Sequence, residues 1–175
     1  MIQNDLFAAV GDTTRIATFS PCRRWRYKLK INWKGGLPRL VVIMLNPSTA
    51  DEVRNDPTIE RVCRRAAMLG FGGVIILNAF AWRDTKPENM KKSVDPVGED
   101  NDLIIRNVLG EAKAAGWTVL VGWGNHGSFR GRDKAVIAMA EEAGVQLHCL
   151  AVNEATGQPQ HPLYVAYDKP MTPWP

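Results

Sequence analysis

Short apolar runs that each end in a polar loop restrict the fold of this 175-residue chain more than any other feature does. They span residues 40–45, 74–77, 118–121 and 147–152. An unbroken apolar run of this length and composition is typical of a strand buried on both faces, as in a parallel sheet. The first run reads LVVIML and stops at Asn46-Pro47. Because ligands bind at the carboxyl ends of such strands, the chemistry is expected in the loops that follow them.

Helical patterns lie between the apolar runs. Residues 56–69 are predicted to form a helix that Asp56 caps, that Pro57 begins and that Gly70 ends. Leu69 belongs to its predicted apolar face, and its solvated face is expected to carry Arg61, Arg64 and Arg65. Further helices are predicted over residues 99–115, with Leu103 on the buried stripe, and 132–143, and a polar loop is expected over residues 83–98.

Strand–helix alternation at these intervals predicts a three-layer α/β/α fold around a central, mostly parallel sheet of four strands. The predicted core spans residues 40–165, and the whole chain (1–175) is interpreted as one α/β domain, long enough to bury a proper core. Right-handed crossovers would then place all four polar loops at one edge of the sheet.

A basic segment precedes this core. Residues 15–39 contain eight Lys and Arg and no acid, with interleaved aromatic residues, and a β-hairpin is predicted over residues 16–36. Basic side chains beside stacking ones suit a nucleic-acid backbone with exposed bases, which makes Arg24 and Arg26 candidate DNA contacts. The alternative is a hairpin whose basic residues simply face water and protect an edge strand from aggregation.

Bulk composition excludes several classes of protein. The hydrophobic fraction of 45% and the charged fraction of 23% are ordinary for a globular protein. No apolar stretch approaches the roughly 18 residues that span a bilayer, so no membrane association is expected. Cys22, Cys63 and Cys149 match neither a zinc spacing nor a disulfide framework, and a cytoplasmic location is therefore expected.

The polar residues near the ends of the four runs are mostly amides and imidazoles. They are Asn46, Asp51, Asn78, Asn125, His126 and His161. No HxH, HxxxH or CxxC spacing supports a metal site, and no serine lies in a G-x-S-x-G nucleophile elbow. The Gly122-Trp123-Gly124 loop lacks the Lys-Ser/Thr ending of a phosphate-cradling Walker loop. An Asn side chain can pair bidentately with a nucleobase edge, although an Asn at a strand end also serves as a turn former.

Four ordered segments resemble motifs of the uracil-DNA glycosylase superfamily across most of residues 40–165. The segments read LNPST, VIILNAFAW, VLVGWGNHG and QHPLY. The chain also resembles a bacterial and phage family catalogued as domain of unknown function 1643. That second resemblance extends through the N-terminal RRWRYKL segment and implies no activity.

The glycosylase resemblance implies a role for each matched residue. Asn46 would hold the water that attacks the sugar, and Asn78 would hydrogen-bond the edge of a flipped base. His161 would donate toward a base carbonyl as the glycosidic bond breaks. Pro47 and Ser48 would form the base-binding wall, with Ser48 standing where the uracil-specific branch has a bulky Tyr. A base with a 5-substituent then becomes a plausible ligand.

The remaining candidates carry alternatives. Asp51 is a second candidate for activating the water, or else a surface acid or helix-proximal cap. The glycine-rich loop offers backbone donors to a phosphate, or else its glycines permit tight packing; its candidate residues are Gly124, Asn125, His126 and Ser128. Leu163 or Tyr164 would fill the base stack that the flipped nucleotide vacates.

The expected function is hydrolysis of the N-glycosidic bond of a non-standard or modified pyrimidine, in single-stranded or mismatched DNA. Neither a metal nor an organic cofactor is implied. One alternative is a non-catalytic protein of the same fold that binds DNA, a nucleotide or a modified base. A third is an enzyme that acts on free nucleosides or hypermodified bases.

Overall fold

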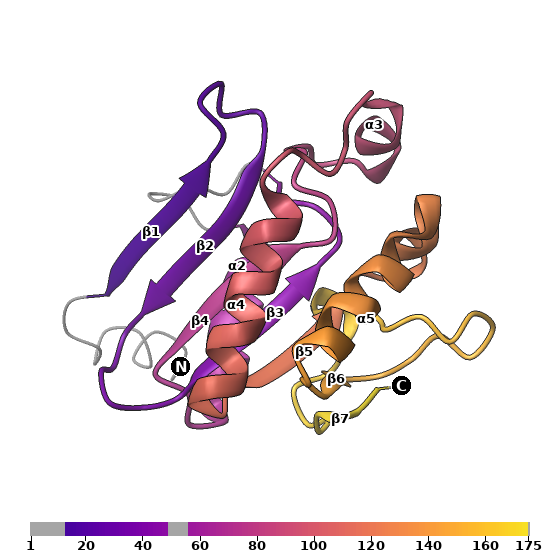
Figure 1. Cartoon of the computed structure of the whole chain (residues 1–175). Helices are drawn as coiled ribbons and strands as arrows, with labels where there is room; N and C mark the ends of the chain where they lie inside the picture. Colours follow the sequence, from indigo (N-terminus) through magenta and orange to yellow (C-terminus); the bar gives the residue numbers. More distant parts are fainter. Residues whose placement is uncertain (1–12, 49–55, 175) are drawn as a thin grey trace.

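The computed structural model describes residues 13–48 and 56–174 (Figure 1). Within these residues, seven strands form one sheet in the order β1-β2-β4-β3-β5-β6-β7. The strands are β1 (Thr14–Phe19), β2 (Arg26–Asn32), β3 (Arg39–Met44), β4 (Gly73–Asn78), β5 (Thr118–Gly122), β6 (Leu147–Cys149) and β7 (Thr172–Pro173).

The sheet is wider than predicted. Its four central strands β4, β3, β5 and β6 correspond to the four apolar runs and pair in parallel. The predicted hairpin consists of β1 and β2, but β2 also pairs antiparallel with β4, so the hairpin belongs to the same sheet. At the other edge, β7 pairs antiparallel with β6. The fold is therefore α/β as predicted, but among the described residues its sheet is mixed and has seven strands, where four mostly parallel strands were predicted.

The described residues form four α-helices and two short 3₁₀ helices. They are α2 (Pro57–Met68), α3 (Pro87–Lys92), α4 (Asn101–Ala115), α5 (Arg132–Glu142), η1 (Asn125–Gly131) and η2 (Pro162–Tyr164). The predicted cap of α2 is confirmed, since Asp56 Oδ1 accepts the backbone N–H of Ile59 over 2.8 Å. The expected loop over residues 83–98 is wrong in part, because α3 begins at Pro87 and is anchored by the fully buried Met90. No helix among the described residues is long and apolar enough to cross a membrane.

The two faces of the sheet carry separate cores. Alternate residues of β3 point to opposite faces: Val41 and Ile43 pack with α4 and α5, whereas Leu40 and Val42 pack with α2. Figure 1 shows α4 and α5 over the near face. Burial on both faces explains the unbroken apolar runs. Two predicted core residues are instead exposed, Leu69 by 50% and Leu103 by 59%, because the buried faces of their helices are rotated away from them.

The arginines of α2 do not form the solvated face that was predicted. Arg65 is only 2% exposed, and its two terminal nitrogens donate to the carbonyl oxygens of four residues in segment 165–169. Arg61 donates to the carbonyl oxygens of Pro162 and Val165. These bonds hold the segment that follows β6 against α2, and with it the η2 turn.

Chain topology places one crevice in the sheet. From β3 the chain moves to β4 on one side, and later to β5 on the other side of β3. Both crossovers are right-handed but run in opposite directions, so α2 and α4 lie on opposite faces of the sheet. The chain therefore leaves β3 toward one face of the sheet and leaves β5 toward the other. Such a switch point is where open α/β sheets bind ligands.

Candidate functional site

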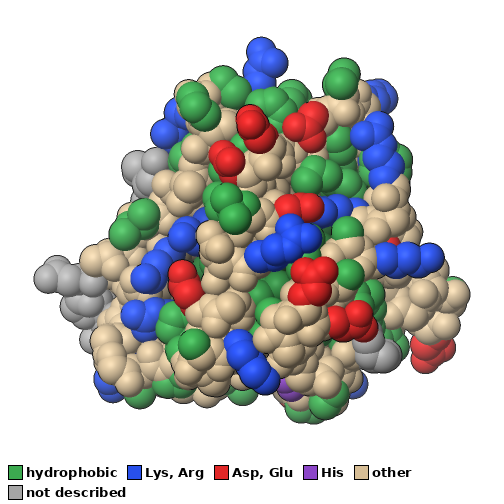
Figure 2. Space-filling view, in the orientation of Figure 1, with side chains coloured by type: hydrophobic (Ala, Val, Ile, Leu, Met, Phe, Trp, Pro, Cys, Tyr) green, Lys and Arg blue, Asp and Glu red, His purple; other side chains and the backbone are tan. Residues whose placement is uncertain are grey.

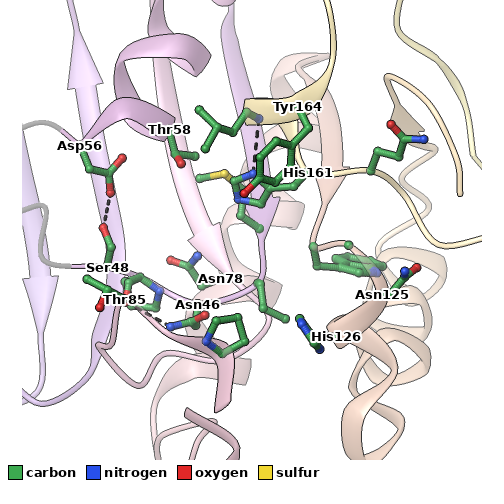
Figure 3. A pocket seen from close by; sticks show the side chains of 18 of the residues that line it. Asn46, Ser48, Asp56, Thr58, Asn78, Thr85, Asn125, His126, His161 and Tyr164 are labelled. Carbon is green, nitrogen blue, oxygen red and sulfur yellow. Dashed lines mark hydrogen bonds between the residues drawn. The ribbon is translucent and has the colours of Figure 1, made fainter. Parts of the chain in front are cut away.

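A cavity of about 540 Å³ opens at the carboxyl ends of β3, β4 and β5, at this switch point (Figure 3). The structure brings most of the predicted site residues to its wall. They are Arg26, Asn46, Pro47, Ser48, Asn78, Gly124, Asn125, His126, His161, Leu163 and Tyr164. Arg24 lines a neighbouring cavity instead. Ser128 lines neither and donates its Oγ proton to the carbonyl oxygen of Asn125 over 3.0 Å, while Asp51 lies outside the described residues.

The Asn46 side chain is oriented by the loop after β4. Its Nδ2 donates to the carbonyl oxygen of Asp84 over 2.8 Å and lies 3.4 Å from that of Trp82. The backbone N–H of Asp84 in turn donates to the carbonyl oxygen of Pro47. Since the amide nitrogen is occupied by backbone, the amide oxygen of Asn46 is the group left to accept a hydrogen bond from a ligand.

Asn78 contributes a buried donor to the cavity. The residue ends β4, is 1% exposed, and its Nδ2 has no hydrogen-bond partner among the described residues. Its backbone is braced, because Asn101 Nδ2 donates to the carbonyl oxygens of Asn78 and Ala79, and Arg132 Nε donates to that of Ala79. An unpaired buried donor costs about 1–3 kcal/mol, so a ligand that accepts from Asn78 recovers that free energy.

The position of His161 is set by the next residue, Pro162, which packs closely against Gly122 at the end of β5. A Cβ atom on Gly122 would lie 2.6 Å from Cδ of Pro162, so only glycine at position 122 allows this approach. Burial lowers the pKa of His161, and the Asp56 carboxylate opposes this shift more weakly. The backbone N–H of Leu163 donates to Nδ1 of His161 over 3.3 Å, which leaves Nε2 as the protonated nitrogen of a neutral ring.

Asp56 was predicted only as a helix cap, yet it lines the cavity. Ser48 Oγ donates to Asp56 Oδ2, while the other carboxylate oxygen caps α2 (Figure 3). A second lining carboxylate, Asp84, accepts from Lys86 N and Asn89 Nδ2 through Oδ1. The loop after β3 and the start of α2 lie at the same edge of the sheet. That topology was the signal that Asp56 lies near the cavity.

Two backbone donors of the glycine-rich loop are engaged within the protein. The N–H of Gly124 donates to the carbonyl oxygen of Pro159 over 2.8 Å, and that of Gly127 to Gly124 over 3.1 Å. A Cβ on Gly127 would overlap the Trp123 ring, so the tight-packing alternative holds there. His126 does line the cavity, and its Nδ1 lies 2.9 Å from Lys91 Nζ. Because an ammonium group only donates, Nδ1 accepts and Nε2 of His126 carries the proton.

Arg26 is not on an exposed basic surface as predicted. It is 1% exposed at the start of β2, where its backbone N–H donates to the carbonyl oxygen of Ala81 over 2.9 Å. The hairpin prediction placed Arg26 at an edge, but β2 has a partner strand on each side. The guanidinium therefore belongs to the wall of the cavity.

Polar residues from the loop after β6 complete the wall and were missed from the sequence. They are Asn153, Gln158 and Gln160. Gln158 is held at both ends of its amide: Oε1 accepts from Trp123 Nε1 and Nε2 donates to Asp133 Oδ2, each over 2.8 Å. A loop of varied polar residues carries no periodic signal, so nothing in the sequence marks these three.

A family model described as "Protein of unknown function (DUF1643)" matches residues 26–163. The chain belongs to the DUF1643 family. Searches of curated proteins and of solved structures found no match. The DUF1643 match begins at the first residue of β2 and ends within η2. It therefore contains every residue of the cavity wall except Tyr164.

This DUF1643 cavity is rich in hydrogen-bonding groups and poor in metal ligands. No group of three or more His, Cys, Asp or Glu residues suited to a metal ion occurs within residues 13–48 and 56–174. The cavity wall offers the donors of Asn78 and His161 and the acceptor of Asn46. Such an arrangement can orient a small planar ligand that carries both carbonyl and N–H groups.

Proposed function

We propose that this DUF1643 protein is a DNA glycosylase-like hydrolase that cleaves the N-glycosidic bond of a non-standard or modified pyrimidine. One observation carries the proposal: Asn46, Asn78 and His161, which the glycosylase resemblance implies as site residues, line a single cavity. Asn78 supports it further, because its buried Nδ2 lacks a partner among the described residues.

The available groups suit a pyrimidine-2,4-dione. Such a base presents two carbonyl oxygens on either side of an N–H group. Asn78 Nδ2 donates to one carbonyl while Oδ1 of the same amide accepts from the N–H, and His161 Nε2 donates to the second carbonyl. A cavity of about 540 Å³ lies in the size range of small-molecule sites. A base that reaches it from DNA must first leave the stack.

The reaction proposed is a hydrolysis. The amide oxygen of Asn46 accepts a hydrogen bond from water and positions it against the anomeric carbon. As the bond from that carbon to the base nitrogen breaks, its electron pair goes to the base, and His161 Nε2–H stabilises the charge on the base carbonyl. The water oxygen bonds to the anomeric carbon, and its proton passes through solvent to the departing base.

Two further features bear on the substrate. Ser48 is small and its hydroxyl is held by Asp56, which leaves room beside a base for a 5-substituent. Tyr164 is 80% exposed and lies with its ring centroid 5.9 Å from that of His161. We assign Tyr164, together with Leu163, to filling the stack that a flipped nucleotide vacates.

Base release tests this proposal directly. Single-stranded and duplex oligonucleotides that carry uracil, a thymine mismatch or a 5-modified pyrimidine are incubated with the protein, and alkali-labile abasic sites are measured. We expect release by the wild type and a loss of at least about 100-fold in Asn46→Ala and His161→Ala. Asn107→Ala, at an exposed position on α4, is the matched control and should retain full activity. The absence of base release from every substrate would contradict the proposal.

A non-catalytic binding protein is the second candidate, and the state of the carboxylates favours it. Both oxygens of Asp56 accept hydrogen bonds from the protein, and Oδ1 of Asp84 accepts two. Asp56 is therefore not placed as an unengaged general base, and at Asp84 only Oδ2 is without a donor among the described residues. Calorimetric titration with pyrimidine nucleosides distinguishes the two candidates: binding that depends on Asn78, without any base release, supports this second one.

A further inference from the structure

A second cavity, of about 420 Å³, adjoins the first, and Ser48 lines both. Its wall comes from the turn between β1 and β2 and from the segment that follows β4. We call it the arginine groove, and it is lined by Arg23, Arg24, Ser48, Trp82 and Arg83.

Three arginines meet in the groove because its two segments are joined. Arg83 donates its backbone N–H to the carbonyl oxygen of Arg24 over 3.0 Å and its side-chain Nη1 to that of Arg23 over 3.2 Å. The Phe19 ring packs under two guanidinium groups, at 3.9 Å from Arg23 and 4.9 Å from Arg83. Stacking on an aromatic ring orders these side chains before any ligand arrives, which lowers the entropy lost on binding.

The charge of the groove is positive and uncompensated at two of these positions. Among the described residues, neither Arg24 nor Arg83 forms an ion pair. The face over α4 and α5 differs, because acidic and basic side chains are interspersed there (Figure 2) and Arg106 pairs with Glu142 over 3.5 Å. A groove that carries one sign of charge attracts an anion more strongly than such a mixed surface does.

Trp82 adds a stacking surface beside the arginines. Its ring meets that of Trp25 edge-on at a centroid distance of 5.4 Å. Trp25 is fixed in turn, because its Nε1 donates to the carbonyl oxygen of Asp95 over 2.9 Å. A fixed indole next to guanidinium groups is the combination that binds the bases and phosphates of a single strand.

We infer that the arginine groove binds the phosphodiester backbone of a single nucleic-acid strand, next to the nucleotide whose base enters the first cavity. Arg24 and Arg83 contact phosphates, and Trp82 stacks on a neighbouring base. This inference rests on the proposed function for the occupant of the first cavity, and it makes a polynucleotide, not a free nucleoside, the substrate class.

The test measures binding of a fluorescein-labelled oligodeoxyadenylate of about 12 nucleotides, which lacks any pyrimidine, over a range of salt concentrations. The Arg24→Ala/Arg83→Ala double variant should bind at least about tenfold more weakly, and its salt slope should be lower by about 1.4 because two phosphate contacts are lost. The control is Lys34→Ala/Arg39→Ala, which also removes two positive charges. Both of its residues lie at the opposite end of the central strands from the groove. Its affinity should change by less than about threefold.

If the double variant does not fold, the test uses Arg24→Ala alone, because the Arg24 side chain is exposed.

Three binding results would overturn the inference. They are equal losses in both double variants, no binding by the wild type at low salt, and competition by deoxyadenosine monophosphate at the concentration of the oligomer. Release of a base from free nucleosides as efficiently as from DNA would also overturn it, while the proposed hydrolysis would stand. Loss of binding in the groove variants, with no base released from any substrate, would support the groove and reject the hydrolysis.

Discussion

Buried polar groups at the α2 interface and in the candidate site differ in what satisfies them. At the interface between α2 and the C-terminal segment, the terminal nitrogens of Arg65 donate to four backbone carbonyls. In the cavity, Asn78 is equally buried, yet its Nδ2 has no partner among the described residues. The first arrangement contributes to stability, whereas the second lowers it in the absence of a ligand.

The difference separates structural polar residues from candidate functional ones. Both residues are polar at nearly zero exposure, so burial alone does not distinguish them. The number of hydrogen bonds does: Arg65 donates to four backbone carbonyls and leaves only Nε unpaired, whereas Nδ2 of Asn78, which lines the cavity, has no partner among the described residues. Asn101 resembles Arg65 in this respect, since its Nδ2 donates to two carbonyl oxygens, and only its Oδ1 has no partner among the described residues.

Replacing Arg65 should have the largest effect on stability. Arg65→Ala removes hydrogen bonds to four carbonyls and is expected to lower the free energy of unfolding by about 3 kcal/mol. Urea denaturation followed by circular dichroism measures this change. Arg64→Ala, one position earlier on the same helix and only half-buried, should change it by less than about 0.5 kcal/mol. Equal losses in the two variants would contradict the structural role assigned to Arg65.

Replacing Asn78 should act in the opposite direction on stability. Asn78→Leu removes the unpaired donor at similar volume, so the free energy of unfolding should stay constant or rise by about 1 kcal/mol. Base release, or nucleoside binding if no base is released, should fall at least about 100-fold. Asn101→Leu is the matched control and should lower the free energy of unfolding by about 2 kcal/mol, measured in the same urea titrations. A comparable destabilisation by Asn78→Leu would show that a protein group satisfies Asn78.

The smallest expected effect is the pH dependence that His161 contributes. Burial holds its pKa below the ordinary value of 6.5, so the unfolded chain takes up this proton first as the pH falls. The stability due to a neutral His161 is therefore complete above about pH 6.5 and declines as the pH falls toward the pKa of the folded state. Urea titrations from about pH 8 to pH 5 should show this decline in the wild type and a smaller one in His161→Gln. Identical pH profiles would argue against a buried, neutral imidazole.

Much of the central fold was predictable because it depends on local patterns. The apolar runs placed β3 to β6, and Asp56 and Pro57 placed the start of α2. Their order along the chain was enough to expect Asn46, Asn78 and His161 at one edge, where the structure finds them in one cavity. Their chemical roles depend on the resemblance to glycosylases and stay predictions.

What only the tertiary structure decided was the partner of each polar group. The sequence presented Arg24, Arg26 and Arg65 as similar surface cations, but one lies in the arginine groove, one in the cavity wall and one against the C-terminal segment. Likewise, the width of the sheet depended on β2 pairing with β4, a contact between distant segments. Periodicity and capping act within a few residues along the chain, whereas burial and hydrogen-bond satisfaction are set by residues that become neighbours only on folding.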